Sequence, residues 1–123
     1  MSDVSPYKKE NQVLNLPFEF ALKITECTEE LETRKRFNMA NQLFKSGTSI
    51  HANIREAQNE ERKEDFIHKM KIAAKEAQET EGWLMLCKYS KLYPAPDQLL
   101  EKLTSILKLL NKIISTAKQP PAN

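Results

Sequence analysis

Apolar residues recur along the chain at intervals of three and four, the period of a helix with one buried face. The first such stripe consists of Phe20, Ile24, Cys27 and Leu31. Its helix is expected to begin near Pro17, because an early helical position tolerates the missing N–H of proline. Leu14 and Leu16 allow the helix to extend further back.

A second stripe predicts a helix from about Thr33 to Asn59. Its apolar positions are Met39, Leu43, Ile50, Ile54 and Ala57. The period continues through the polar stretch KSGTSIHANIREA, residues 45–57, which is therefore predicted to be helical and not a loop. Glycine inside a helix costs on the order of 1 kcal/mol relative to alanine. Gly47 is accordingly expected where a neighbouring backbone approaches closely.

The third predicted helix runs from about Lys63 to Leu92, and the fourth from about Pro96 to Lys118. The stretch YPAPD separates them, since prolines exclude helix continuation, and Asp97 is expected to cap the fourth helix. The fourth helix is the most apolar, and its apolar face is wider than one helix pair requires. This excess is expected to cover a second neighbour or another subunit.

Four helices with short connections predict an all-α fold, an antiparallel up-down-up-down four-helix bundle. The chain has only 2 glycines, which leaves little for hairpin turns. We expect a flexible N-terminus over residues 1–10, the bundle over 11–118 and a disordered tail over 119–123. No signal-peptide pattern and no apolar run of roughly 20 residues is evident, and the isolated Cys27 and Cys87 suit a reducing compartment. The expected location is cytoplasmic, without membrane contact.

Polar residues stand beside the apolar stripes of the second and third helices. They are Ser46, Ser49, Asn53 and Glu56 in the second helix, and Lys75, Glu76 and Glu79 in the third. If the two helices are neighbours, these groups are expected to form a nearly complete network that locks the pairing. A buried polar group left unpaired costs about 1–3 kcal/mol. A catalytic pocket lined by the same residues is the alternative.

The sequence offers little for catalysis or metal binding. Asp65 and His68 have the helical spacing of one ligand pair, but a di-iron bundle needs a second pair and only His51 remains. Ser46 or Ser49 lies on the same helix as His51, at spacings that do not bring the side chains together. We therefore predict no catalytic residue, no cofactor, no metal site and no enzymatic activity.

The formal net charge is +2, but it is unevenly distributed: residues 1–32 carry 3 Lys/Arg against 7 Asp/Glu, and residues 33–123 carry 16 against 10. Candidate phosphate-binding cations are Arg34, Lys35, Arg36, Arg62, Lys63, Lys102, Lys108, Lys112 and Lys118. Because no aromatic residues interleave with them for base stacking, they predict weak, largely sequence-independent binding of RNA or DNA.

A protein–protein assembly or adaptor scaffold without nucleic-acid binding is the alternative function. It is supported by the broad apolar face of the fourth helix and by Trp83, Tyr89 and Tyr93 near the end of the third. Apolar surface beyond what a small bundle can bury is typical of an interface.

Two stretches, QLFKSGTSIHANIREA (residues 42–57) and DFIHKMKIAAKEAQETEGWL (residues 65–84), together resemble a known family. Its members are small bacterial four-helix bundle proteins encoded by intervening sequences of large-subunit ribosomal RNA genes, and they carry a ribosomal-protein label. The accessory variability protein of diversity-generating retroelements is a relative. The matching positions include Ser46, Gly47, Ser49, Asn53, Glu56, Lys75, Glu76 and Glu79.

This resemblance implies an antiparallel bundle, a ring-shaped homopentamer and no known enzymatic activity. For the retroelement relative it implies nucleic-acid binding together with a reverse transcriptase. Two positions depart from the family pattern. His51 stands where glycine is usual, and Arg62 where a helix-capping serine is usual, which leaves Asn59 as a candidate cap.

Overall fold

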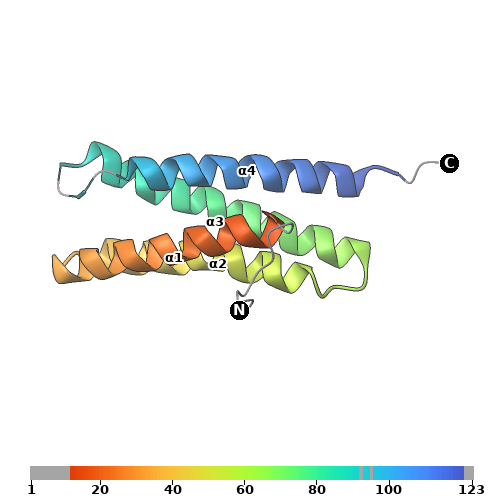
Figure 1. Ribbon diagram of the computed structural model, residues 1–123, viewed down its shortest axis with the longest axis horizontal. Coiled ribbons are helices and arrows are strands. Elements are labelled where there is room, and N and C mark those ends of the chain that lie inside the picture. Colours follow the sequence, from red (N-terminus) through yellow and green to blue (C-terminus); the bar gives the residue numbers. More distant parts are fainter. Residues whose placement is uncertain (1–11, 92, 95, 121–123) are drawn as a thin grey trace, which may run out of the picture.

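The computed structural model describes residues 12–91, 93–94 and 96–120. These residues form four helices: α1 Gln12–Thr33, α2 Phe37–Ala57, α3 Lys63–Tyr89 and α4 Asp97–Lys118. Each helix packs against the next one along the chain, and α4 returns to contact α1 (Figure 1). The predicted all-α antiparallel four-helix bundle is confirmed.

The core consists of the predicted apolar stripes. Its largest fully buried aliphatic and aromatic side chains are Phe20, Ile24, Leu31, Leu43, Ile50, Ile54, Met70, Leu84, Leu103, Ile106 and Leu110. The apolar excess expected on α4 is not left exposed, because its flanking Leu100, Leu107 and Ile113 are half-buried against the core. In the described residues, the exposed large apolar side chains lie on α1, α2 and α3 instead.

Helix α1 begins more than a turn earlier than the predicted start at Pro17, which lies inside the helix. Proline there removes the hydrogen bond that its N–H would donate toward Val13, and its ring crowds the Val13 carbonyl, at a cost of about 3 kcal/mol. Val13, Leu14 and Leu16 pack against the core in return. The burial of these side chains offsets the cost of the proline, because each contributes up to about 2 kcal/mol.

The predicted start of the second helix at Thr33 is wrong, since Thr33 ends α1 and residues 34–36 form the turn. Lys35 adopts the left-handed conformation, with φ 62°. The Arg36 N–H then donates to the Leu31 carbonyl at 2.8 Å, which closes the end of α1. Glycine is the usual residue at such a helix stop, so the sequence did not reveal it.

The predicted helix caps are wrong as well. Pro96 occupies the N-cap of α4, and Asp97 lies in the first turn, 3.5 Å from the Lys88 ammonium. Arg62 occupies the N-cap of α3 without a side-chain cap, while the backbone N–H of Asn59 bonds within the preceding turn. Asp97 still stabilises α4, because a carboxylate favours the positive end of the helix dipole.

Helix α2 runs through the stretch KSGTS, as predicted, and Gly47 is buried against α1. A Cβ atom at this position would lie 2.9 Å from Cγ1 and 3.0 Å from Cγ2 of Ile24. The close neighbour is therefore a side chain, not the backbone that the sequence led us to expect. Ile24 is fully buried, so it could move away only by displacing other core side chains.

Replacing Gly47 with alanine is expected to destabilise the protein by about 1–2 kcal/mol, because overpacking against Ile24 exceeds the gain in helix propensity. Gly82→Ala is the matched control: this exposed helical glycine has no atom within 4 Å of an added Cβ. The control is expected to stabilise by about 0.5–1 kcal/mol. Urea unfolding measures both changes. Equal stabilisation of the two variants would contradict the close contact at Gly47.

Candidate nucleic-acid interface

The predicted cations do not form one patch, because they lie at both ends of the bundle. Arg34, Lys35 and Arg36 occupy the α1–α2 turn, whereas Arg62 and Lys63 occupy the start of α3. Helix α2, with 21 residues, separates the two ends by about 30 Å. Figure 1 shows these ends at the left and the right of the bundle.

At the α1–α2 turn, two of the three cations have partners within the protein. The Arg34 guanidinium lies 3.0 Å from the Glu30 carboxylate. The Arg36 guanidinium lies 5.9 Å from the ring centroid of Tyr93, a cation–π distance. The Arg36 contact joins the turn to the α3–α4 connection, and the Arg34 ion pair leaves this end partly neutralised.

At the other end, lysines of α3 and α4 come together. The Lys63 ammonium donates to the Gln119 carbonyl at 3.3 Å. Across the seam, the close approach of the Lys71 ammonium, and then its positive charge, lower the pKa of Lys118. No carboxylate of the described residues lies within ion-pair distance of Lys71 or Lys118. Two like charges held side by side favour the approach of an anion.

Lys71 was not among the predicted cations. It follows Lys63 by eight residues, a little more than two helical turns, so both lie on one flank of α3. That periodicity was a signal for Lys71, but only the packing of α4 on this flank brings Lys118 beside it.

The surrounding charge is mainly positive. From Lys102 to Lys118, helix α4 carries four lysines and no acidic residue, and residues 63–75 of α3 carry four lysines against two acidic residues. One of these acids, Glu64, lies 2.7 Å from the Arg62 guanidinium. We refer to residues 63–75 of α3 and 102–118 of α4 as the lysine-rich half. Lys108 and Lys112, both predicted cations, are exposed within it.

Ser46 connects α2 to α3 through a buried hydrogen bond. Its Oγ accepts from Thr80 Oγ1 at 2.9 Å and donates to the Gln42 carbonyl at 3.0 Å. Thr80 is fully buried and was missed by sequence reasoning, although a hydroxyl between Ala77 and Leu84 in an apolar stripe was a signal. This bond sets the register of the two helices.

The other residues of the predicted polar network lie nearer the surface. Glu56 accepts from the Lys69 ammonium at 2.7 Å, a second α2–α3 contact. Ser49 and Asn53 donate to carbonyls of their own helix, at 2.6 Å and 2.8 Å. Lys75 and Glu79 are exposed, and Glu76 is half-buried. The described residues thus join α2 to α3 by two polar contacts and not by one continuous network.

His51 lies apart from the serine hydroxyls and packs against α1. Its ring meets the Phe18 ring edge-on, with 5.2 Å between centroids. Nε2 is buried and has no hydrogen-bond partner among the described residues. Burial, and then the charge of Arg55, lower the pKa of His51. The histidine that replaces the usual glycine therefore serves as a contact between α1 and α2.

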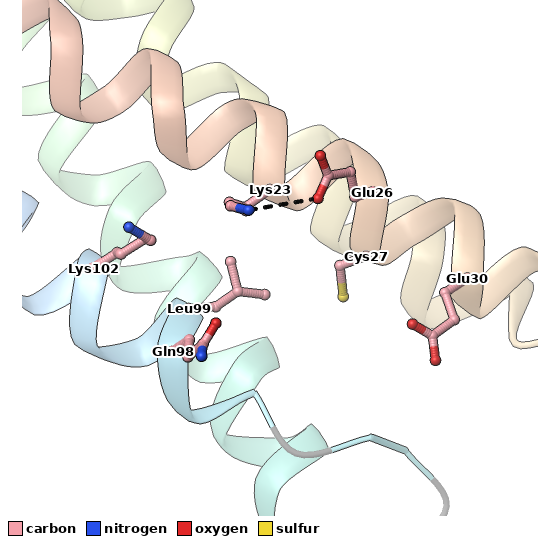
Figure 2. Close-up of a pocket in the computed structure, with 7 residues that line it drawn as sticks. All are labelled: Lys23, Glu26, Cys27, Glu30, Gln98, Leu99 and Lys102. Carbon is pink, nitrogen blue, oxygen red and sulfur yellow. Dashed lines mark ion pairs between the residues drawn. The ribbon is translucent and has the colours of Figure 1, made fainter.

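Two shallow recesses follow the α1–α4 seam, with volumes of about 210 and 280 Å³. Figure 2 shows the first, lined by Lys23, Glu26, Cys27, Glu30, Gln98, Leu99 and Lys102. Ligand pockets usually measure about 300–1,000 Å³. Burial raises the pKa of the Cys27 thiol, so the thiol stays protonated and is a weak nucleophile. Neither recess is lined by Glu56, Glu76 or Glu79.

Over the described ranges, no three His, Cys, Asp or Glu side chains are grouped to hold a metal ion. Asp65 and His68 are both exposed. Cys27 and Cys87 are free thiols, and burial raises the pKa of Cys87 to about 11. Within the same ranges, every helix is too short or too polar to span a membrane.

The geometry defines a class of protein: a small antiparallel helical bundle with one lysine-rich half and shallow surface recesses. The family model described as 23S rRNA-intervening sequence protein matches residues 9–112, and the chain belongs to this family. The family resemblance noted in the sequence is confirmed.

A solved structure supports the same assignment. It is a protein of unknown function from the S23 ribosomal protein family of Bacteroides thetaiotaomicron, 40% identical to this chain. The alignment covers 83% of this chain and 97% of that chain, with a TM-score of 0.79. No curated protein matches this chain.

His51 is expected to make stability depend on pH. Because its pKa is lowered in the folded state, the unfolded chain binds the proton more readily. The contribution of neutral His51 to the free energy of unfolding is complete above the unfolded-state pKa of about 6.5. It is lost as the pH falls from that pKa toward the lower folded-state pKa. Urea unfolding at several pH values between 7.5 and 5 should therefore show a smaller acid-side loss for His51→Gln than for the wild type. The control His68→Gln, at an exposed position, should retain the wild-type loss; equal curves for all three proteins would refute the effect.

Proposed function

We propose that this protein binds RNA or DNA as a homo-oligomer, weakly and largely without regard to sequence, and has no enzymatic activity. The phosphate backbone contacts the lysine-rich half of α3 and α4. The observation that carries the proposal is the run of four lysines without an acidic residue over residues 102–118 of α4, beside the lysines of α3, with the Lys63 ammonium bonded to the Gln119 carbonyl at 3.3 Å.

The charge pattern supports a polyanion as the ligand. Lysines that release counterions from phosphates supply affinity without sequence information. Helix α1 carries five glutamates against one lysine, so it repels phosphate and restricts binding to the other side of the bundle. The turn at residues 34–36 is a lesser contact, because Arg34 and Arg36 already have partners.

Self-association would place several weak phosphate-binding sites in one assembly. One chain has a net charge of only +2, but several copies present several lysine-rich halves to one strand. Linked sites raise the overall affinity without any new contact, provided that the strand can reach them together. The names of the family and of its solved member, an rRNA-intervening sequence protein and a ribosomal-protein family, favour RNA as the first ligand to test.

A gel mobility shift with labelled single-stranded RNA and duplex DNA tests the proposal. Wild-type protein should retard both at about 50 mM salt and much less at about 200 mM. Lys71→Ser/Lys118→Ser should weaken binding to all sequences alike and reduce the salt slope by about two.

The matched control is Lys23→Ser/Lys45→Ser, which removes the same charge from exposed positions of α1 and α2. It should bind nearly as the wild type does. An equal loss in the control would show that net charge alone matters. No retardation of either nucleic acid at low salt would reject the proposal and favour the adaptor alternative.

A further inference from the structure

One exposed stripe of α3 runs from the lysine-rich half to the end of the helix. Its positions recur at spacings of four and three residues, so they share one face of the helix. They are Lys71, Lys75, Gln78, Gly82, Met85 and Tyr89, all exposed. Tyr89 follows Lys71 by 18 residues, which gives the stripe a length of about 27 Å. We call these six residues the α3 stripe, and none of them is acidic.

The α3 stripe ends on an exposed aromatic ring. Tyr89 is 73% exposed, a high fraction for a large ring, and Met85 one turn earlier is 40% exposed. The Lys88 ammonium lies 5.7 Å from the centroid of the Tyr89 ring, a cation–π distance. The same ammonium lies 3.5 Å from the Asp97 carboxylate, which takes up part of its charge. Apolar surface of this kind beside cations is typical of a binding site.

The charges along the α3 stripe leave a path for an anionic chain. Two lysines begin it, and Lys88 and the exposed Lys91 stand at its far end. At its centre Gly82 leaves the helix uncovered, since no atom lies within 4 Å of an added Cβ. Glu79 and Glu81 border the stripe, one on each flank. A polyanion is therefore guided along the stripe and away from its flanks.

The two kinds of side chain in the stripe suit two parts of one ligand. Lysines contact phosphates, whereas an exposed aromatic ring stacks on the face of a base. In a duplex, the neighbouring base pairs already cover these faces, so only an unpaired base is free to stack. We propose that the α3 stripe binds a single-stranded segment of RNA or DNA, with phosphates at Lys71 and Lys75 and an unpaired base on the Tyr89 ring.

This inference rests on the proposed function and adds to it the contact with a base. In the sequence, no aromatic residue interleaves with the predicted cations. The stripe nevertheless places Tyr89 on the face of α3 that carries Lys71 and Lys75. Every base has a flat π-face, so stacking tolerates any sequence, in agreement with binding that is largely independent of sequence.

Fluorescence anisotropy with end-labelled DNA tests the base contact on the full chain. The probes are a short single strand, a strand of the same length with abasic sites in place of the bases, and a duplex. At about 50 mM salt, the wild type should bind the single strand about tenfold more tightly than the abasic strand. The two strands carry the same phosphates, so this ratio reports the bases alone. It uses the unchanged protein and does not depend on a variant that folds.

Substitutions at Tyr89 assign the contact to this ring. Tyr89→Ser should weaken binding of the single strand about tenfold, leave binding of the abasic strand and the duplex unchanged, and keep the wild-type salt slope, because no charge is removed. Tyr89→Trp should retain the wild-type affinity. The matched control is Phe37→Ser, which removes a 54% exposed ring from α2 and should bind all three probes as the wild type does. Far-UV circular dichroism checks that each variant is folded.

Equal wild-type affinity for the strands with and without bases would overturn the inference. So would a Tyr89→Ser variant that binds the single strand unchanged, or one whose loss extends equally to the abasic strand and the duplex. If Tyr89→Ser alters the assembly size in size exclusion but not the single-strand affinity, the ring belongs to a protein contact and the inference is rejected. The proposed function fails in a different way: the wild type then binds none of the three probes at low salt, and the inference falls with it.

Discussion

The packing of Ile24 onto Gly47 is the contact on which the bundle depends. Helix α2 presents two small consecutive residues to two different neighbours. Gly47 admits the buried side chain of α1, and Ser46 bonds to Thr80 of α3. A larger residue at either position would push one neighbour outward, since protein interiors are close-packed. The polar stretch KSGTS is therefore the place where three helices are held in register.

The polar side chains in and after this stretch form hydrogen bonds within the protein. Thr48, Ser49 and Asn53 donate to carbonyls one turn back in α2, and this local bonding leaves no hydroxyl aimed at a base. His51 is turned to the Phe18 ring. The α1–α4 seam, where the recesses are found, mixes both signs of charge in a shallow surface. These features favour a scaffold whose function lies on its surface.

The arrangement of the helices decides where the exposed apolar and charged side chains lie. Exposed apolar side chains lie toward the end with the α1–α2 turn, on opposite faces, and the Lys71–Lys118 pair lies at the other end. Glutamates dominate α1, which packs against α4 but not against α3. The proposed contact of the lysine-rich half with a polyanion therefore uses a part of the molecule away from the exposed apolar side chains. Repeated lysine-rich surfaces in an assembly are well suited to a long phosphate backbone.

The sequence by itself determined the four helices and their arrangement as a bundle, because a 3.6-residue apolar period is a local property that each segment carries alone. It also identified the family and placed Gly47 within a helix. Only the tertiary structure decided that Ile24 meets Gly47, that Thr80 meets Ser46 and that Lys71 lies beside Lys118. It also decided that residues 34–36 form a turn with Lys35 in the left-handed conformation. These pairings join residues far apart in the chain, and they follow from which flanks of the helices pack together, a choice that periodicity within one helix does not contain.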